Sequence, residues 1–267
     1  MIATSPKPDL KVRLAKLLQT VSASRLNTFH TCRLQFYFRY VLEIASASTP
    51  ARHVGSAVHH VLSIWNKARW RKQVLAPDEL STEFNLYWVS GRAEGVQWNA
   101  DDEQKHKAKA WSLVEAYLQQ TPILPNEAAE GVEVRVEAEL PGLPTLVGIL
   151  DLIRPGSRIV DFKTSAQTPN PQTSDHLHET QLSLYSVLYR EATGKVEKGL
   201  ELHHLVKLKE PKLVVSSMPP MVERQKTRLF KLIDSYVAGV SREDFVPSPS
   251  PMACACCEFI NRCRKWS

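Results

Sequence analysis

The chain has 267 residues, a formal net charge of +6, and 43% hydrophobic and 23% charged residues, the balance of a globular protein with a core. No apolar run approaches the ~20 residues that span a bilayer, and residues 1–9 lack the apolar stretch of a secretory signal. We therefore expect a cytoplasmic protein with no membrane partner. Its excess of positive charge favours a polyanionic partner without specifying a fold.

The first third of the sequence predicts helices. Apolar and aromatic residues recur at helical spacing in Arg25–Leu42, Gly55–Lys72 and Glu103–Leu118, and Ser22 to Ser24 form an N-cap region before the first of these. Basic residues gather in groups, including one around Trp70 (Arg69, Arg71 and Lys72). Each group alone fits a solvated surface; together they permit nucleic-acid binding without demonstrating it.

The middle of the chain changes to the period of strands. Valines alternate with charged residues in Gly131–Leu140, Leu146–Ile153 is nearly all apolar, and Arg158–Thr164 follows a turn at Pro155 to Ser157. The elements expected after this hairpin are a helix at His176–Ala192, strands at Leu200–Leu208 and Leu213–Ser217, and a helix at Pro220–Val240. This order predicts an α/β fold.

A carboxylate interrupts the apolar run of the hairpin at Asp151, where burial is costly unless a partner neutralises the charge. The next strand directs Asp161 and Lys163 to one face. A hairpin symmetric about Gly156 sets Asp151 opposite Asp161, and a divalent cation between them would remove their repulsion. Carboxylates of this kind suit Mg²⁺ or Mn²⁺. The alternative is a surface hairpin whose Asp161 and Lys163 are merely exposed.

Four short motifs follow one another along the chain. They are Gly55-Ser56-Ala57-Val58-His59, Gly148-Ile149-Leu150-Asp151, Asp161-Phe162-Lys163-Thr164 and Gln181-Leu182-Ser183-Leu184-Tyr185. In this order they resemble the Gly-x-x-x-His motif, motifs II and III and the Gln-x-x-x-Tyr motif of RecB-like PD-(D/E)xK nucleases, which include AddB nuclease domains and CRISPR-adaptation exonucleases.

The resemblance implies a role for each matching residue. The implied metal ligands are His59, Asp151, Asp161 and the backbone carbonyl of Phe162, and the implied catalytic residues are Asp151, Asp161, Lys163, Gln181 and Tyr185. Gln181 and Tyr185 are four residues apart and share one helical face. Glu133 stands where many members have a glutamate, without an assigned role. A structural role is the alternative for His59, beside His60, and for Tyr185, whose helix also carries core leucines.

Four of the five cysteines lie between Cys254 and Cys263, and in a reducing compartment such crowding points to metal rather than disulfides. RecB-like nucleases with an iron–sulfur cluster have one cysteine before the nuclease core and three after it. The resemblance therefore implies a [4Fe–4S] cluster ligated by Cys32, Cys254, Cys257 and Cys263, which would staple the tail. Cys256 is a spare thiol that could replace Cys254 or Cys257, and structural Zn²⁺ is the rival cofactor.

We thus expect a restriction-endonuclease-like mixed sheet core flanked by helices, with a helical N-terminal part and a cluster-stapled C-terminal tail. The expected parts are a helical region at 1–125, a nuclease core at 126–246, and a cysteine tail at 247–267 that packs back on the N-terminal region.

The expected activity is that of a Mg²⁺- or Mn²⁺-dependent deoxyribonuclease, an exonuclease acting on single-stranded or open DNA ends in DNA repair or recombination. The alternative is a non-catalytic DNA-binding or assembly subunit that keeps the fold. The sequence holds no Gly-x-x-x-x-Gly-Lys-Ser/Thr motif. Any unwinding would come from a partner, such as a helicase or another repair or recombination protein.

Overall fold

The computed structural model describes residues 9–92, 95–96, 98, 102–124, 126–255 and 257–266. The chain forms two compact units, one made of residues 1–46, 137–148 and 222–267, the other of residues 47–136 and 149–221. His59, Asp151, Asp161 and Lys163 all lie in the second unit. Within the described ranges, no helix combines the length and the apolar character that crossing a membrane requires.

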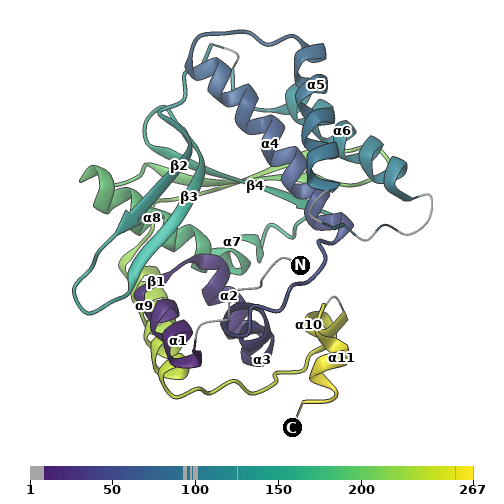
Figure 1. The fold of residues 1–267 in the computed structure, drawn as a ribbon. Coiled ribbons are helices and arrows are strands. Elements are labelled where there is room, and N and C mark those ends of the chain that lie inside the picture. Colours follow the sequence, from purple (N-terminus) through teal and green to yellow (C-terminus); the bar gives the residue numbers. More distant parts are fainter. Residues whose placement is uncertain are drawn as a thin grey trace. The chain divides into compact units, whose positions relative to one another are not determined.

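The strands form a six-stranded mixed sheet (Figure 1). Its strands are β1 (Thr20–Val21), β2 (Gly131–Ala138), β3 (Thr145–Arg154), β4 (Arg158–Ser165), β5 (Gly199–Val206) and β6 (Lys212–Met218). The strand order is β1-β3-β4-β5-β6, with β2 also paired to β3. The β3–β4 and β5–β6 pairs are antiparallel, whereas β4 and β5 are parallel. The expected mixed sheet flanked by helices is confirmed.

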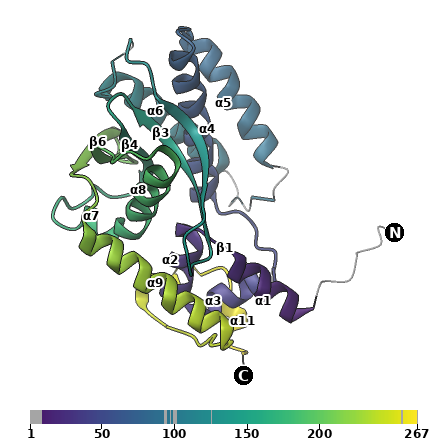
Figure 2. The ribbon, with the colours of Figure 1, turned by 90° about the vertical axis from the view of Figure 1, so that its left-hand side faces the viewer.

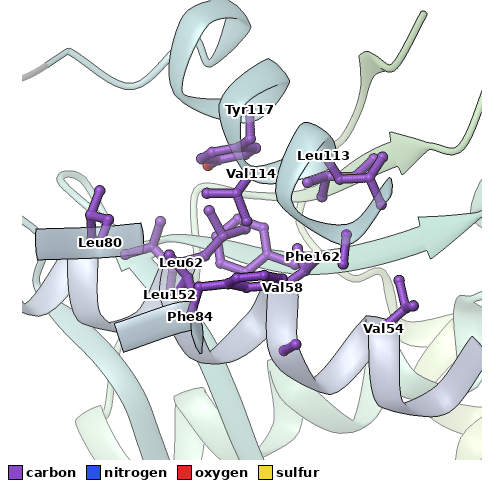
Figure 3. Close-up of a cluster of buried hydrophobic side chains, with 14 of the residues drawn as sticks. Val54, Val58, Leu62, Leu80, Phe84, Leu113, Val114, Tyr117, Leu152 and Phe162 are labelled. Carbon is purple, nitrogen blue, oxygen red and sulfur yellow. The ribbon is translucent and has the colours of Figure 1, made fainter. Parts of the chain in front are cut away.

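The helices of the second unit cover both faces of its part of the sheet (Figures 1 and 2). They are α4 (Pro50–Trp70), α5 (Pro77–Arg92), α6 (Asp102–Gln120), α7 (Ser174–Leu177) and α8 (Glu179–Thr193). Helices α4 to α6 bury Leu152 and Phe162 of the sheet together with Val58 and Tyr117 (Figure 3). Val160 belongs to the same buried cluster. Because neighbouring residues of a strand point to opposite faces, Asp161 and Lys163 face the other way, toward α8.

The other unit is mainly helical. Its helices are α1 (Leu10–Gln19), α2 (Ala23–Thr31), α3 (Arg33–Phe36), a π-helix at Tyr37–Val41, α9 (Glu223–Ser241), α10 (Pro251–Ala255) and α11 (Ile260–Cys263). Phe29 of α2 packs edge-on against Phe36 and against Tyr236 of α9. The approach depends on Gly239, since a Cβ there would collide with the Phe29 ring. Ser22 caps α2 as expected, by accepting a hydrogen bond from the Arg25 amide.

Two expectations about the helices need correction. The segment Arg25–Leu42 is not one helix, because Cys32 is extended (φ −160°, ψ 111°) and separates α2 from α3. Arg69 is not part of a basic surface: it is buried, and its guanidinium donates to the side chain of Asn66 and to the backbone carbonyls of Leu124 and Glu127. The structure also contains α5, which the sequence pattern did not single out.

Candidate active site and cysteine pocket

The candidate site lies where β3 and β4 separate. Paired positions run from Arg154 opposite Arg158 to Leu152 opposite Val160, and continuing this register by one step sets Asp151 opposite Asp161. At this step the Phe162 amide donates to Asp151 Oδ2 over 2.9 Å. The carboxylate of Asp151 on β3 thus accepts a hydrogen bond from a backbone amide of β4.

Asp151 and Asp161 are both buried. Burial first, and then the charge of Asp161, raise the pKa of Asp151 above its ordinary value. Two ionised carboxylates in this position oppose each other's charge, and burial amplifies the penalty. The pair therefore favours a positive partner.

Glu133 and His59 join Asp151 from β2 and α4. Ligand atoms of these three side chains all lie within 4.8 Å of one another, and His59 Nδ1 is 3.5 Å from Asp151 Oδ2. Glu133 has a left-handed backbone (φ 51°) although it lies within a strand. Such a conformation is uncommon outside glycine and changes the direction of a strand side chain. The structure therefore adds Glu133 to the candidate metal ligands.

Asp161 and Lys163 are linked by an amide from α8. Lys163 Nζ donates to Gln181 Oε1 over 2.7 Å, and Gln181 Nε2 donates to Asp161 Oδ1 over 2.8 Å and to the Tyr185 hydroxyl over 2.7 Å. Lys163 Nζ also lies 2.7 Å from Asp161 Oδ2, as an ion pair. That second oxygen is buried, and among the described residues no donor has the angle of a hydrogen bond to it. It is available to a further ligand.

The protonation of the surrounding groups suits a cation. Burial lowers the pKa of His59, although nearby carboxylates and a hydrogen bond to the Phe162 backbone work against this shift. The imidazole is therefore neutral near pH 7 and has a lone pair for a metal. Burial and then the charge of Asp151 raise the pKa of Glu133. Burial and nearby carboxylates raise that of Tyr185, which stays a neutral phenol.

The site residues that the sequence indicated are thus brought together, and their chemical roles are taken up below. The described geometry does not group Asp161 with His59, Glu133 and Asp151 as one compact ligand set. Glu133 was noticed in the sequence without a role. The alternation of valines and charged residues in β2 does not predict that the Glu133 side chain lies beside Asp151, because it does not reveal the left-handed backbone at this residue.

Cys32, Cys254, Cys257 and Cys263 line one pocket of the helical unit. The pocket is otherwise largely apolar, and the buried cluster of Leu34, Phe38 and Phe259 packs against three of these cysteines. Burial is the main cause that raises the pKa of Cys257, and the thiols of Cys32 and Cys254 contribute. The four thiols are free of disulfides. Cys256, the spare thiol of the sequence, lies outside the described residues.

Comparisons with known proteins show the superfamily of the chain. The model of the PD-(D/E)XK nuclease superfamily matches residues 20–264, so the chain belongs to this superfamily. No curated protein matches the sequence.

Among solved structures, the crystal structure named "Putative exonuclease" from Eubacterium rectale has a TM-score of 0.63 at 14% identity, over 100% of this chain and 94% of that one. The two share a fold. An alkaline exonuclease from Laribacter hongkongensis aligns over 87% of this chain and 93% of its own at 10% identity. Its TM-score of 0.33 does not establish a common fold.

Proposed function

We propose that this protein is a Mg²⁺- or Mn²⁺-dependent deoxyribonuclease of the RecB-like type. The observation that carries the proposal is the gathering of His59, Glu133 and Asp151 around one point, beside the buried carboxylate of Asp161. One neutral imidazole and oxygen ligands in this number suit a small divalent cation. His59, Glu133, Asp151 and Asp161 are the proposed ligands, together with the Phe162 carbonyl.

Phosphodiester hydrolysis would divide between metal and protein. A bound cation lowers the pKa of a coordinated water and stabilises negative charge on the phosphate. Lys163 would donate to a phosphate oxygen or to the attacking water, adding to that stabilisation. Gln181 holds the ammonium of Lys163 and the carboxylate of Asp161 at fixed positions, and Tyr185 receives its remaining amide proton. Gln181 and Tyr185 would thus position the groups that act on the substrate.

The catalytic proposal is tested with end-labelled DNA and Mg²⁺ or Mn²⁺. Asp161→Asn and Lys163→Ala should each lower the rate by about 10²-fold or more, as expected when a group that stabilises charge in the transition state is removed. Glu191→Gln and Lys195→Ala change exposed residues in and just after α8 and should keep full activity. Equal cleavage by all four variants would reject the proposed active site and would favour the alternative of a non-catalytic DNA-binding subunit.

An exonuclease on single-stranded or open ends is the proposed mode, by analogy with the RecB-like family. Linear single-stranded DNA labelled at one end should be degraded, whereas closed single-stranded circles should resist. Binding should weaken steeply as salt rises, since backbone contacts release counterions from DNA. Cleavage of the circles at the rate of the linear strand would favour an endonuclease instead.

We further propose that the cysteine pocket holds a [4Fe–4S] cluster. A Zn²⁺ site with Zn–S bonds of ~2.3 Å sets its four sulfurs only about 3.8 Å apart. Four cysteines that line one pocket suit either cofactor. The resemblance to RecB-like nucleases with one cysteine before the core and three after it favours the cluster.

Anaerobic purification tests the cluster. Wild-type protein should be brown and carry iron and sulfide, and Cys32→Ser or Cys263→Ser should lose both. Colourless protein with stoichiometric zinc would support the rival cofactor. Cys256→Ser is the matched control, because the proposed ligand set excludes this residue; loss of iron in this variant would reassign one ligand.

A further inference from the structure

The cysteine tail is attached to the helical unit by contacts that do not involve its cysteines. The first attachment precedes Cys254. Leu34 of α3 donates its amide to the Val246 carbonyl over 3.1 Å, and Arg33 forms an ion pair with Asp244. The ring of Phe245 stacks on Tyr37, with centroids 5.0 Å apart.

The second attachment follows Cys257 directly. Glu258 accepts hydrogen bonds from Gln35 Nε2 over 3.1 Å and from Arg39 Nε over 2.9 Å, and its side chain is only 17% exposed. Phe259 is 2% exposed and packs edge-on against Phe38, with ring centroids 5.6 Å apart. A carboxylate and a phenyl ring thus hold the tail at two adjacent positions.

The two attachments lie close in sequence to three of the four pocket cysteines. Cys254 and Cys257 lie between the two attached stretches of tail, and Cys32 immediately precedes the helix that carries Leu34 and Gln35. Fixing the tail at both places raises the effective concentration of its thiols near Cys32, whereas a free tail would have to find the pocket from many conformations.

We propose that Glu258, gripped by Gln35 and Arg39, is a latch that docks the cysteine tail before any cluster binds. The pocket is then preformed, and cluster assembly does not have to order the tail. Glu258 is in this sense a positioning residue for the cofactor. The docking itself is independent of the proposed cluster; only its consequence for cofactor retention rests on the proposed function.

Hydrogen–deuterium exchange on chelator-treated, metal-free protein tests the docking. The wild-type amides of residues 257–266 should stay protected. In Glu258→Gln and Arg39→Gln they should exchange about 10–100 times faster, because hydrogen bonds to charged groups are lost. The charge-exchanged double variant Arg39→Glu with Glu258→Arg should recover part of the protection. Asp234→Asn, an exposed acid of α9 in the same unit, is the control and should behave as wild type.

Cofactor retention is the second readout. Iron release to a chelator from anaerobically purified protein should be about tenfold faster in Glu258→Gln than in wild type. A wild type without iron would reject the proposed cluster and leave the exchange experiment valid. An unprotected tail in metal-free wild type, or a Glu258→Gln tail as protected as wild type, would overturn the latch. So would equal iron release from an iron-bearing wild type and Glu258→Gln.

Discussion

Two charged clusters occupy the same hairpin at its two ends. At the fork of β3 and β4, Asp151 lies close to Glu133, and Lys163 neutralises part of the acidic charge by pairing with Asp161. Near the turn, Arg154 of β3 binds Glu127 through two hydrogen bonds of 2.8 Å each.

The cluster near the turn continues from Arg154 into the core. Arg154 Nη1 donates to Glu201 over 3.0 Å, and Arg158 Nε lies 3.4 Å from the same carboxylate. Glu201 also bonds His203, whose other ring nitrogen lies 3.2 Å from the Tyr117 hydroxyl. Two arginines thus neutralise two glutamates.

The balance of charge distinguishes the two clusters. Burial opposes ionisation of Glu201, but hydrogen bonds from His203 and Arg154 outweigh it and hold its pKa below the usual range. The pKa values of Asp151 and Glu133 are raised instead. A cluster that contains its own counterions stabilises the fold, whereas one with three carboxylates and one lysine is suited to bind a cation.

The largest expected effect separates the clusters by stability. Glu201→Gln should lower the free energy of unfolding by about 3 kcal/mol, because it leaves buried partners without their counterion. Asp151→Asn in metal-free protein should raise it by up to about 1 kcal/mol, since a repulsion between facing carboxylates disappears. Urea unfolding with a chelator present measures both. An equal loss of stability in both variants would contradict this distinction between a stabilising cluster and a cation-binding one.

Metal binding should stabilise one cluster only. Mn²⁺ at about 100 times its dissociation constant should add about 2.7 kcal/mol to the stability of the wild type. Thermal unfolding with and without Mn²⁺ should show this increase in Glu201→Gln and not in Asp151→Asn. An undiminished shift in Asp151→Asn would place the metal elsewhere.

The pH dependence of stability should have opposite signs. The raised pKa of Asp151 means that the metal-free fold binds more protons than the unfolded chain, so its contribution falls as pH rises from the ordinary value of 3.8. The lowered pKa of Glu201 makes its contribution fully present above the ordinary value of 4.5 and lost as pH falls. Stability differences between wild type and each variant, measured from about pH 3 to about pH 7, should slope in opposite directions, above about pH 4 for Asp151 and below about pH 4.5 for Glu201.

The smallest effect concerns the left-handed backbone of Glu133. Both Glu133→Ala and Glu133→Gly remove the carboxylate and should weaken Mn²⁺ binding. Glycine usually destabilises a strand relative to alanine, but at φ 51° it should be the more stable by about 1 kcal/mol. Urea unfolding of the two variants compares them directly. A more stable alanine variant would mean that the residue is not left-handed in solution.

The hairpin could be predicted from the sequence because its cause is local. An acid in an apolar strand, a tight turn and an Asp-x-Lys in the next strand fix both register and facing side, and the structure has that register. Strand and helix positions elsewhere agree to within a few residues; the helix expected at His176–Ala192 is α8, ending at Gly194 in a left-handed conformation.

Other features depend on distant contacts and could not be predicted. The sequence around Arg71 predicts that Arg69 is an exposed base. In the structure it is buried, because its guanidinium donates to backbone carbonyls of residues more than fifty positions later. The break at Cys32 leaves no trace in the helical pattern of Arg25–Leu42. The latch joins Gln35 and Arg39 to a glutamate over two hundred residues away, and no local rule pairs them.

The place of β4 within the sheet has a consequence for how the protein loses activity. Residues 158–165 pair with β5 along their whole length, and residues 158–160 also pair with β3 on the other side. A strand inside a sheet opens only with the rest of its unit, whereas edge strands and termini fray earlier. Heat inactivation should therefore coincide with the cooperative melting of this unit, because Asp161 and Lys163 lie on one of its last strands to come apart.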